Sequence, residues 1–360
     1  MMDNAINTLP PRRYKVFFWI ILGALSIFFA EVVSGSTMFP FDPWSLIVTF
    51  PLYTLHLLIL GYIVFNYGKP TLYTLFAAGA LFGMYEAYIT KVLWDPTWGE
   101  AMLTVGGIAV AETIMLVLFW HCFMAFIIPL LVGENILTCS REIINESPNR
   151  IKQIFKAGKK SYVLFVVFIL LCGIFQSANS HSPKHSLLSG FSTTAVLMLL
   201  IYLWRNKTKG KEYDIKTLLP NKKELRVLVT LLLLQYLFLG IVLRREALPG
   251  FVPQLIVWLI YGGLIILLVF NLSKSRTAIL PESVDSPVRF SWPKLVSVSL
   301  LFPVSSAVSK ILVGDSGGII ILIFWLIGGI IGISILLLSI ILLLRSVFFN
   351  KSEDDNGVFS

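Results

Sequence analysis

Residues 318–344 read GIIILIFWLIGGIIGISILLLSIILLL and contain no charged side chain. A membrane-spanning helix needs about 20 mostly apolar residues, so this stretch is long enough to cross a bilayer. Comparable runs recur along the chain and predict ten spans, at 14–33, 44–66, 71–91, 109–133, 161–178, 187–204, 225–243, 251–272, 295–313 and 318–345. The fold class we predict is therefore all-α, a polytopic integral membrane protein.

The composition of the whole chain supports this prediction. Of its 360 residues, 56% are hydrophobic and 14% are charged, and the mean hydropathy is +0.82. Soluble globular proteins have about 45–50% apolar and about 25% charged residues. So large an apolar excess cannot be enclosed in one water-soluble core, which excludes a cytosolic enzyme or a secreted domain.

The net charge of +9 arises from basic residues that lie between the predicted spans. If the N-terminus lies in the cytoplasm, 24 of the 29 Lys and Arg residues fall on the cytoplasmic side. The positive-inside rule expects such an asymmetry, so we predict a cell-membrane protein with both termini cytoplasmic. The expected partners of the basic loops are membrane lipids with anionic headgroups, and no nucleic acid; the sequence indicates no oligomeric state.

The chain divides into regions of different chemistry. We predict a four-helix membrane region at 1–134, which carries the intramembrane Glu and His groups, followed by a basic cytoplasmic loop at 135–160. A six-helix apolar membrane region at 161–347 and a disordered tail at 348–360 complete the chain. The segment 97–108 is either an outer loop or a short re-entrant piece.

Five ionisable side chains fall within the first four spans: Glu31, His56, Glu86, Glu112 and His121. Ionisable groups in a bilayer are costly and usually face the interior of the bundle, so each one is a candidate functional residue. Spans joined by short loops tend to be neighbours. We therefore expect one polar pocket that opens to the outer side of the membrane.

The candidate catalytic residues are the carboxyls and one imidazole of this set. Glu86 would act as a general base for water, and His121 would position or stabilise that water. The other two carboxyls, Glu31 and Glu112, would assist. The candidate substrate-binding residues are His56, Tyr85 and Trp120. Two His and one Glu are able to hold zinc, but no HExxH motif is present, so no metal and no cofactor are predicted.

The segment Gly83-Met84-Tyr85-Glu86-Ala87-Tyr88-Ile89-Thr90-Lys91 resembles the EExxxR helix of the CAAX-protease and bacteriocin-processing family. Glu86 matches the first glutamate and Lys91 the arginine, while Ala87 stands in the place of the second glutamate. His121 resembles the histidine of that family's next motif. The resemblance implies a polytopic protein in which glutamates and histidines on separate helices activate water for peptide hydrolysis.

The wider region 30–134 is also similar to unannotated prokaryotic multi-pass membrane proteins, in which a glutamate-bearing helix is followed by a helix of the form H-x7-P…E. His121, Pro129 and Glu134 match that spacing. This second resemblance implies no activity.

Structural roles remain open for each group. Glu31 can extend to the membrane interface, Glu86 can pair with Lys91 at a helix end, and Glu112 can cap the helix that it begins. The two histidines, His56 and His121, can each be a hydrogen-bonded residue of the core. The functional hypothesis is a membrane-embedded hydrolase-like protein that processes peptides or lipids. The alternatives are a transporter coupled to protons or cations, and a non-catalytic membrane assembly protein.

Overall fold

A computed structural model of the chain describes residues 9–155, 159–209, 211–277, 291–314 and 316–349. Within these residues, ten helices are long and apolar enough to cross a membrane, so the predicted fold class is confirmed. Each helix coincides with one predicted span. Most of the tail that we predicted to be disordered lies outside the described residues, but its first two residues, 348 and 349, still belong to the last helix.

The first four spans are built from several helical segments each. They are α1 (Arg12–Ile27) with η1 (Phe28–Val32), η2 (Ser45–Thr49) with α2 (Phe50–Tyr67), α3 (Leu72–Gly83) with η3 (Glu86–Thr90), and α4 (Val110–Thr113) with η4 (Ile114–Ile127) and α5 (Ile128–Leu137). The later spans are α8 (Lys159–Asn179), α9 (Pro183–Lys207), α11 (Lys222–Val242), α12 (Phe251–Thr277), α13 (Trp292–Val313) and α14 (Gly317–Phe349). Shorter elements connect them: β1 (Thr104–Val105), β2 (Ile108–Ala109), α6 (Glu142–Asn145), α7 (Asn149–Ile154), α10 (Ile215–Leu218) and the 3₁₀ turn η5 (Arg245–Ala247).

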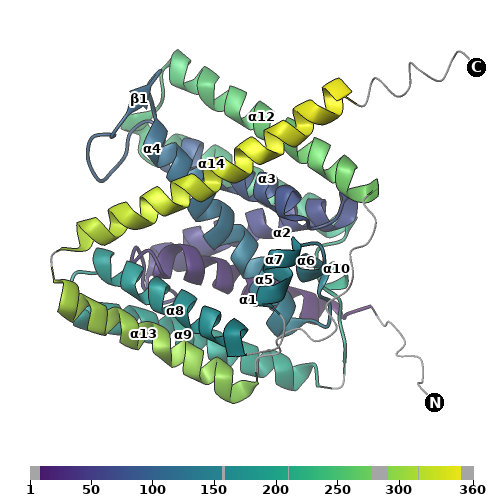
Figure 1. Cartoon of the computed structure of the whole chain (residues 1–360), viewed down its shortest axis with the longest axis vertical. Coiled ribbons are helices and arrows are strands. Elements are labelled where there is room, and N and C mark those ends of the chain that lie inside the picture. The colour runs from purple at the N-terminus through teal and green to yellow at the C-terminus, as the bar shows by residue number, and fades with distance from the viewer. Residues whose placement is uncertain (1–8, 156–158, 210, 278–290, 315, 350–360) are drawn as a thin grey trace, which may run out of the picture.

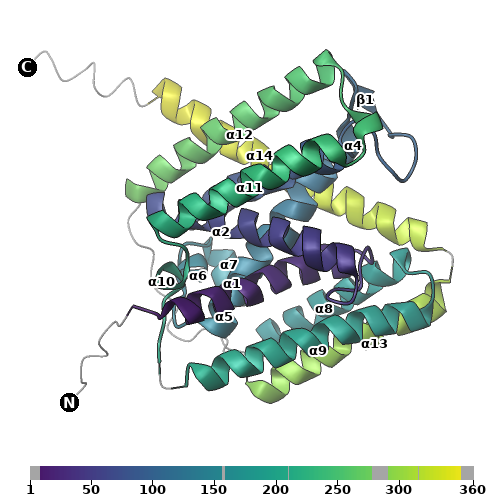
Figure 2. The same ribbon diagram turned by 180° about the vertical axis from the view of Figure 1, so that it is seen from behind.

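The first four spans form the centre of the bundle, and the other six pack around them (Figures 1 and 2). α11 packs on α2 and η3, and α12 packs on α3. On the other side α13 packs on both α8 and α9, while α14 crosses η4 and α8. α1 begins and α14 ends at one end of the bundle, the right-hand end in Figure 1, which we call the terminal end. The opposite end carries the β1–β2 hairpin, and we call it the hairpin end.

The hairpin decides between the two alternatives for segment 97–108. This segment is a loop with a short hairpin and contains no re-entrant helix. β1 and β2 pair antiparallel through Gly106 and Gly107, whose φ angles are 57° and 80°. A two-residue hairpin turn with positive φ at both positions favours glycine. The turn lies against the start of α12, where a Cβ on Gly107 would meet the Pro253 ring at 2.7 Å.

Glycines let α3 and η4 approach closely. A Cβ on Gly79 would lie 2.7 Å from the Cys122 carbonyl oxygen, and a Cβ on Gly83 would lie 2.8 Å from the Val117 Cα. Small residues at helix interfaces permit such backbone contact in membranes. The close approach of these two helices brings the end of α3 beside the middle of η4, where the candidate catalytic residues lie.

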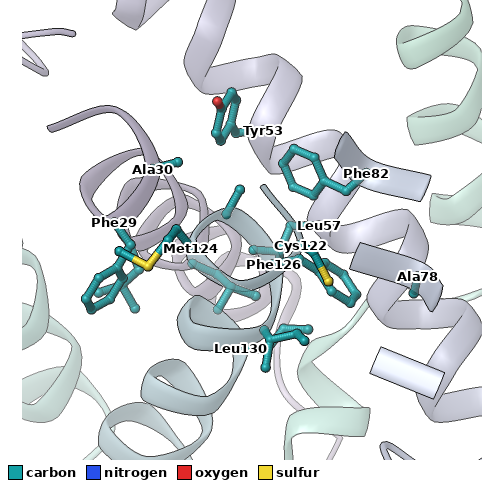
Figure 3. Packing of buried hydrophobic residues seen from close by; sticks show 14 of the residues in the cluster. Phe29, Ala30, Tyr53, Leu57, Ala78, Phe82, Cys122, Met124, Phe126 and Leu130 are labelled. Atoms are coloured by element: carbon teal, nitrogen blue, oxygen red, sulfur yellow. The ribbon is translucent and has the colours of Figure 1, made fainter. Parts of the chain in front are cut away.

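An apolar core fills the four central spans on the terminal side of those residues. Figure 3 shows Leu57 of α2, Ala78 of α3 and Phe126 of η4 converging in this core, and all three are fully buried. Leu130 of α5 continues the core further toward the terminal end. The polar part of the bundle therefore lies toward the hairpin end.

Candidate functional site

The structure brings together four of the predicted site residues, Glu31, Tyr85, Glu86 and His121, from three spans. Glu31 lies in η1, Glu86 begins η3, and His121 lies in the middle of η4. Glu86 and His121 are almost fully buried, with exposed fractions of 6% and 3%. Tyr53 of α2 and Tyr85, the residue before η3, complete the group, and both are buried.

His121 is the centre of this group. Its Nε2 lies 3.3 Å from Oε1 of Glu86, 2.9 Å from the Tyr85 hydroxyl and 3.0 Å from the Tyr53 hydroxyl. Its Nδ1 lies 3.2 Å from the carbonyl oxygen of Leu116, five residues earlier in η4. The imidazole is thus held at both nitrogens, and three polar groups from two other spans converge on Nε2.

These contacts restrict where the protons lie. The Leu116 carbonyl can only accept, so Nδ1 of His121 carries a hydrogen and donates it. In a neutral imidazole Nε2 would then be an acceptor, which an ionised Glu86 oxygen would repel at 3.3 Å. One proton held between the two groups, on Nε2 or on the Glu86 carboxyl, would remove this repulsion. The second carboxyl oxygen of Glu86 accepts from the Thr90 hydroxyl.

Glu31 joins the group through Tyr53. The Tyr53 hydroxyl donates to one Glu31 carboxyl oxygen, and the Ser36 hydroxyl donates to the other. The hydroxyls of Tyr53 and Tyr85 lie 2.7 Å apart. Hydrogen bonds therefore connect Glu31 through Tyr53 to His121, and His121 in turn contacts Glu86.

The backbone geometry around these residues is unusual. Four π-helical segments occur in the described part of the chain, η1, η2, η3 and η4, and all of them lie in the first four spans. Glu31, Glu86 and His121 each lie in one of them. π-helical turns are rare and occur frequently at functional sites. In η4 the i→i+5 geometry brings the Leu116 carbonyl beside His121, which orients the imidazole.

A cavity of about 420 Å³ opens onto this group at the hairpin end. Its inner wall includes Glu31, Tyr53, Tyr85 and Glu86, whereas His121 lies behind the wall. Its rim includes Trp44, which is 50% exposed. The site is thus a one-sided polar pocket with a carboxyl at its inner end and an imidazole behind that carboxyl.

Two charged rim residues were not among the predicted site residues, Asp42 and Arg244. Burial acts to raise the pKa of Asp42, but hydrogen bonds from the Ser45 N–H and the Thr37 hydroxyl lower that pKa overall. Arg244 has a positive φ of 50° and donates to the Thr90 carbonyl at 2.9 Å and to the Asp95 carboxylate. In the sequence both residues look like ordinary interfacial charges, so only the fold could identify them.

His56 lies outside the cavity, in the layer behind it. Its Nδ1 donates to the Leu52 carbonyl at 2.8 Å, and its Nε2 therefore accepts from the Tyr236 hydroxyl at 2.9 Å. Its ring stacks on Phe82 at 5.0 Å between centroids. Both nitrogens are satisfied within the protein, so the structure gives His56 a packing role and no access to the cavity.

Glu112 and Trp120 also lie outside the cavity. Glu112 is in the first turn of α4, and it accepts from the Met102 N–H of the preceding loop at 3.4 Å; it makes no side-chain cap to an N–H of α4. The Trp120 indole donates to the Ala30 carbonyl at 3.1 Å, and its ring packs on Phe175. Neither residue contacts the group around His121 by any hydrogen bond or ion pair within the described residues.

Lys91 does not pair with Glu86. It ends η3 with a φ of 63°, and its buried ammonium donates to the Leu243 carbonyl at 2.5 Å and the Tyr88 carbonyl at 3.3 Å. Burial lowers the pKa of this ammonium, and the nearby Arg244 lowers it further. Lys91 therefore links the end of α11 to the end of η3 by hydrogen bonds.

Glu134, the last residue of the second resemblance, accepts from the Glu142 N–H at 2.6 Å and caps α6.

The structure shows no group of three or more His, Cys, Asp or Glu side chains suited to a metal within the described residues. One His-x3-His pair, His181 and His185, was missed in the sequence, and its rings lie 5.7 Å apart at the start of α9. This pair has no third ligand of those types in the part of the chain described.

Comparisons with known proteins agree with the fold. A model described as an uncharacterised membrane protein family matches residues 20–351. An uncharacterised protein of Archaeoglobus fulgidus is 38% identical over 275 residues, which cover 76% of this chain and 82% of the relative. No solved structure matches the chain. The resemblance to unannotated multi-pass membrane proteins is thereby confirmed, whereas no match to the CAAX-protease family was found. Since the family model covers nearly the whole sequence, the chain belongs to this uncharacterised membrane protein family.

Proposed function

We propose that the protein is a membrane-embedded hydrolase that processes a peptide or lipid substrate at an outward-facing site. The observation that carries the proposal is the 3.3 Å contact between Glu86 and His121 at the inner end of the cavity. Glu86 lines the cavity and His121 supports it from behind, so one carboxyl group faces both a substrate and a proton-accepting imidazole.

Glu86 is the proposed general base. When the proton between the two groups lies on His121, Glu86 is an ionised carboxylate and can take a proton from a water molecule in the cavity. The oxygen of that water attacks a carbonyl carbon of the substrate. The C–N or C–O bond then breaks, and the leaving group takes the proton from the Glu86 carboxyl.

A hydroxyl donor is available for the negative charge that develops on the carbonyl oxygen. The Tyr53 hydrogen is committed to Glu31. The Tyr85 hydroxyl lies within hydrogen-bond distance of both Tyr53 and His121 and lines the cavity. Its hydrogen can therefore turn toward a substrate oxygen, and a donor placed in advance at such a position stabilises the transition state. Glu31 keeps Tyr53 oriented and is the assisting carboxyl.

The walls of the cavity indicate where the substrate comes from. Val48, Leu52 and Ile89 line it alongside the acidic and hydroxyl groups. Leu46 and Ile47, which flank the cavity in η2, are exposed at 44% and 71%. A cavity with apolar walls beside exposed apolar residues suits a substrate that lies in the membrane interface, such as an acyl ester or a peptide segment.

The test compares matched carboxamide variants on the purified protein in detergent, with fluorogenic acyl esters and membrane-segment peptides as substrates. Glu86→Gln removes the base and is expected to lower hydrolysis by about 10²–10⁴-fold. Glu112→Gln makes the same chemical change outside the cavity and is expected to leave hydrolysis unchanged. Full activity of a folded Glu86→Gln variant would contradict the proposal and favour a non-catalytic assembly role.

Coupled transport of protons or cations is a second candidate, because two carboxyls are connected by the hydrogen bonds from Glu31 through Tyr53 to His121 and by the contact of His121 with Glu86. Transport needs access from both faces, whereas the core on the terminal side of the site is apolar. The assay conditions distinguish the two functions, because hydrolysis can be measured in detergent whereas coupled transport requires sealed vesicles with a gradient. A flux that depends on Glu86 without any hydrolysis would favour transport.

A further inference from the structure

Two adjoining cavities lie at the terminal end, far along the spans from the site at the hairpin end. The first, about 250 Å³, lies between α5, the end of α7 and α8, and its walls include Leu131, Leu164 and Phe168. The second, about 340 Å³, is polar and includes Arg141, Arg205 and Lys211. They share the lining residues Asn135 and Ile136. An apolar cavity thus continues directly into a basic one.

We propose that these two cavities together bind one anionic phospholipid. Its acyl chain occupies the apolar cavity, and its phosphate lies among the basic side chains. This inference concerns a region separate from Glu86 and does not depend on the proposed hydrolysis.

The charges of the polar cavity favour an anion. Three cationic side chains line it, Arg141, Arg205 and Lys211, against one carboxylate, Glu212. Arg141 is held in place by donating to the carbonyls of Ser140 at 2.5 Å and Glu134 at 3.2 Å. A guanidinium fixed in this way is suited to bind a phosphate oxygen.

Aromatic residues place this cavity at the depth of lipid headgroups. The Trp204 indole donates to the Leu137 carbonyl at 2.8 Å, where α5 ends. The Tyr14 ring contacts Trp204 and Tyr213, with centroids 6.4 Å and 5.9 Å away. The Lys211 ammonium lies 5.0 Å from the Tyr14 centroid. Trp and Tyr gather at the boundary between hydrocarbon and water, so the basic groups lie where a phosphate lies and the apolar cavity lies where an acyl chain begins.

The apolar cavity requires an occupant of this kind. Its lining is almost entirely hydrocarbon, and Leu164 at its edge is 47% exposed. On the surface of a membrane-spanning bundle such a groove is filled by lipid rather than water. The continuity with the basic cavity then selects a lipid whose headgroup is negative.

The test measures lipid binding to the purified full-length protein in dodecyl maltoside by native mass spectrometry and by the shift in Tm. Phosphatidylglycerol is expected to bind more tightly than phosphatidylcholine of the same acyl chains and to raise Tm further. Because each cation near an anionic lipid contributes about 1 kcal/mol, Arg205→Gln and Lys211→Gln should each weaken phosphatidylglycerol binding on the order of fivefold. Phosphatidylcholine, whose choline cation offsets the charge of its phosphate, should lose less affinity than phosphatidylglycerol in both variants.

Two further variants control this experiment. Lys223→Gln removes an exposed lysine of α11 outside both cavities and should leave the preference unchanged. Leu164→Trp fills the apolar cavity and should weaken both lipids. Equal binding of the two lipids to the unaltered protein would overturn the proposal. Stabilisation by glycerol phosphate as strong as that by phosphatidylglycerol would also overturn it, since it would show an anion site without a role for the acyl chain.

Discussion

The centre and the periphery of this bundle differ in burial, helix geometry and chemistry. In the four central spans, 56–78% of the most apolar window is buried within the protein, against 11% for α11 and α14. The π-helical segments that the structure describes belong to the centre, as do the buried Glu86 and His121. Ionisable groups need partners that lipid cannot supply, so the chemistry lies where other spans enclose it.

The periphery is less uniform than the apolar frame that the sequence predicted. α11 supplies Tyr236, the hydrogen-bond partner of His56, and Arg244 follows its end at the rim of the cavity. α8, α9 and α13 meet along small and hydroxyl-bearing residues, where a Cβ on Gly173 would clash with Ser305. The inner sides of these peripheral helices are therefore partly polar.

The close contact of α3 with η4 should be the most sensitive feature of the centre. Gly83→Ala places a Cβ 2.8 Å from the Val117 Cα, which forces apart the helices that carry Glu86 and His121. We expect a loss of about 1–3 kcal/mol in the free energy of unfolding, together with loss of activity. The measurement is unfolding by denaturing detergent, followed by tryptophan fluorescence.

Gly262→Ala is the peripheral counterpart. No heavy atom lies within 4 Å of a Cβ at Gly262, in α12, and alanine is favoured over glycine in helices. This variant should be as stable as the unaltered protein or more so. Equal destabilisation by Gly83→Ala and Gly262→Ala would remove the distinction between enclosed centre and lipid-facing periphery.

Tyr53→Phe should have a smaller effect on stability. It deletes the hydroxyl that donates to Glu31 and lies 3.0 Å from the buried His121, so both groups lose a hydrogen-bond partner. We expect a cost of about 1–2 kcal/mol, measured by the same unfolding assay. The control Tyr202→Phe changes a tyrosine that is 52% exposed on α9 and should not change the free energy of unfolding. An equal loss in the free energy of unfolding at both positions would show that the hydrogen bonds of Tyr53 do not stabilise the site.

Cysteine labelling should distinguish the centre from the loops without altering stability. Cys122 and Cys172 are buried, whereas Cys139 is half-buried beyond the end of α5. Burial and the neighbouring Asp214 raise the pKa of the Cys139 thiol to about 11. Since the thiolate is the reactive form, maleimide labelling of Cys139 should be slow at neutral pH and rise about tenfold per pH unit below that pKa.

The same residue tests the predicted orientation. If both termini are cytoplasmic, an impermeant maleimide added to right-side-out vesicles should label Cys139 only after the membrane is permeabilised. Labelling of Cys139 in sealed vesicles would show that the orientation in the membrane is the opposite of the predicted one. Labelling of Cys122, in η4, in the folded protein would contradict the enclosed centre.

The sequence predicts the fold of this protein well because span length and apolarity are local properties. It also predicts that Glu31, Glu86 and His121 come together, since chain direction and helix rise determine depth; in the structure they do, with His121 behind the wall of the cavity. The sequence does not predict which side chains face the cavity. His56 and Glu112 lie in the same spans as the site residues, but whether they face the cavity depends on the rotation of each helix about its axis. The π-helical turns change this rotation within the spans, and periodicity in the sequence does not reveal them. Asp42 and Arg244 reach the rim through loop conformations that no motif encodes.

A double-mutant cycle on Glu86 and His121 tests the central claim most directly, because it needs no substrate. The free energy of unfolding is measured for Glu86→Gln, His121→Gln and the double variant, and for the control pair Glu112→Gln and His56→Gln, which share no contact. Since Glu86 and His121 are in direct contact, the double variant should cost less than the sum of the single ones, with a coupling of about 0.5–3 kcal/mol. The control pair should be additive. Additivity for Glu86 and His121 as well would contradict the site described here.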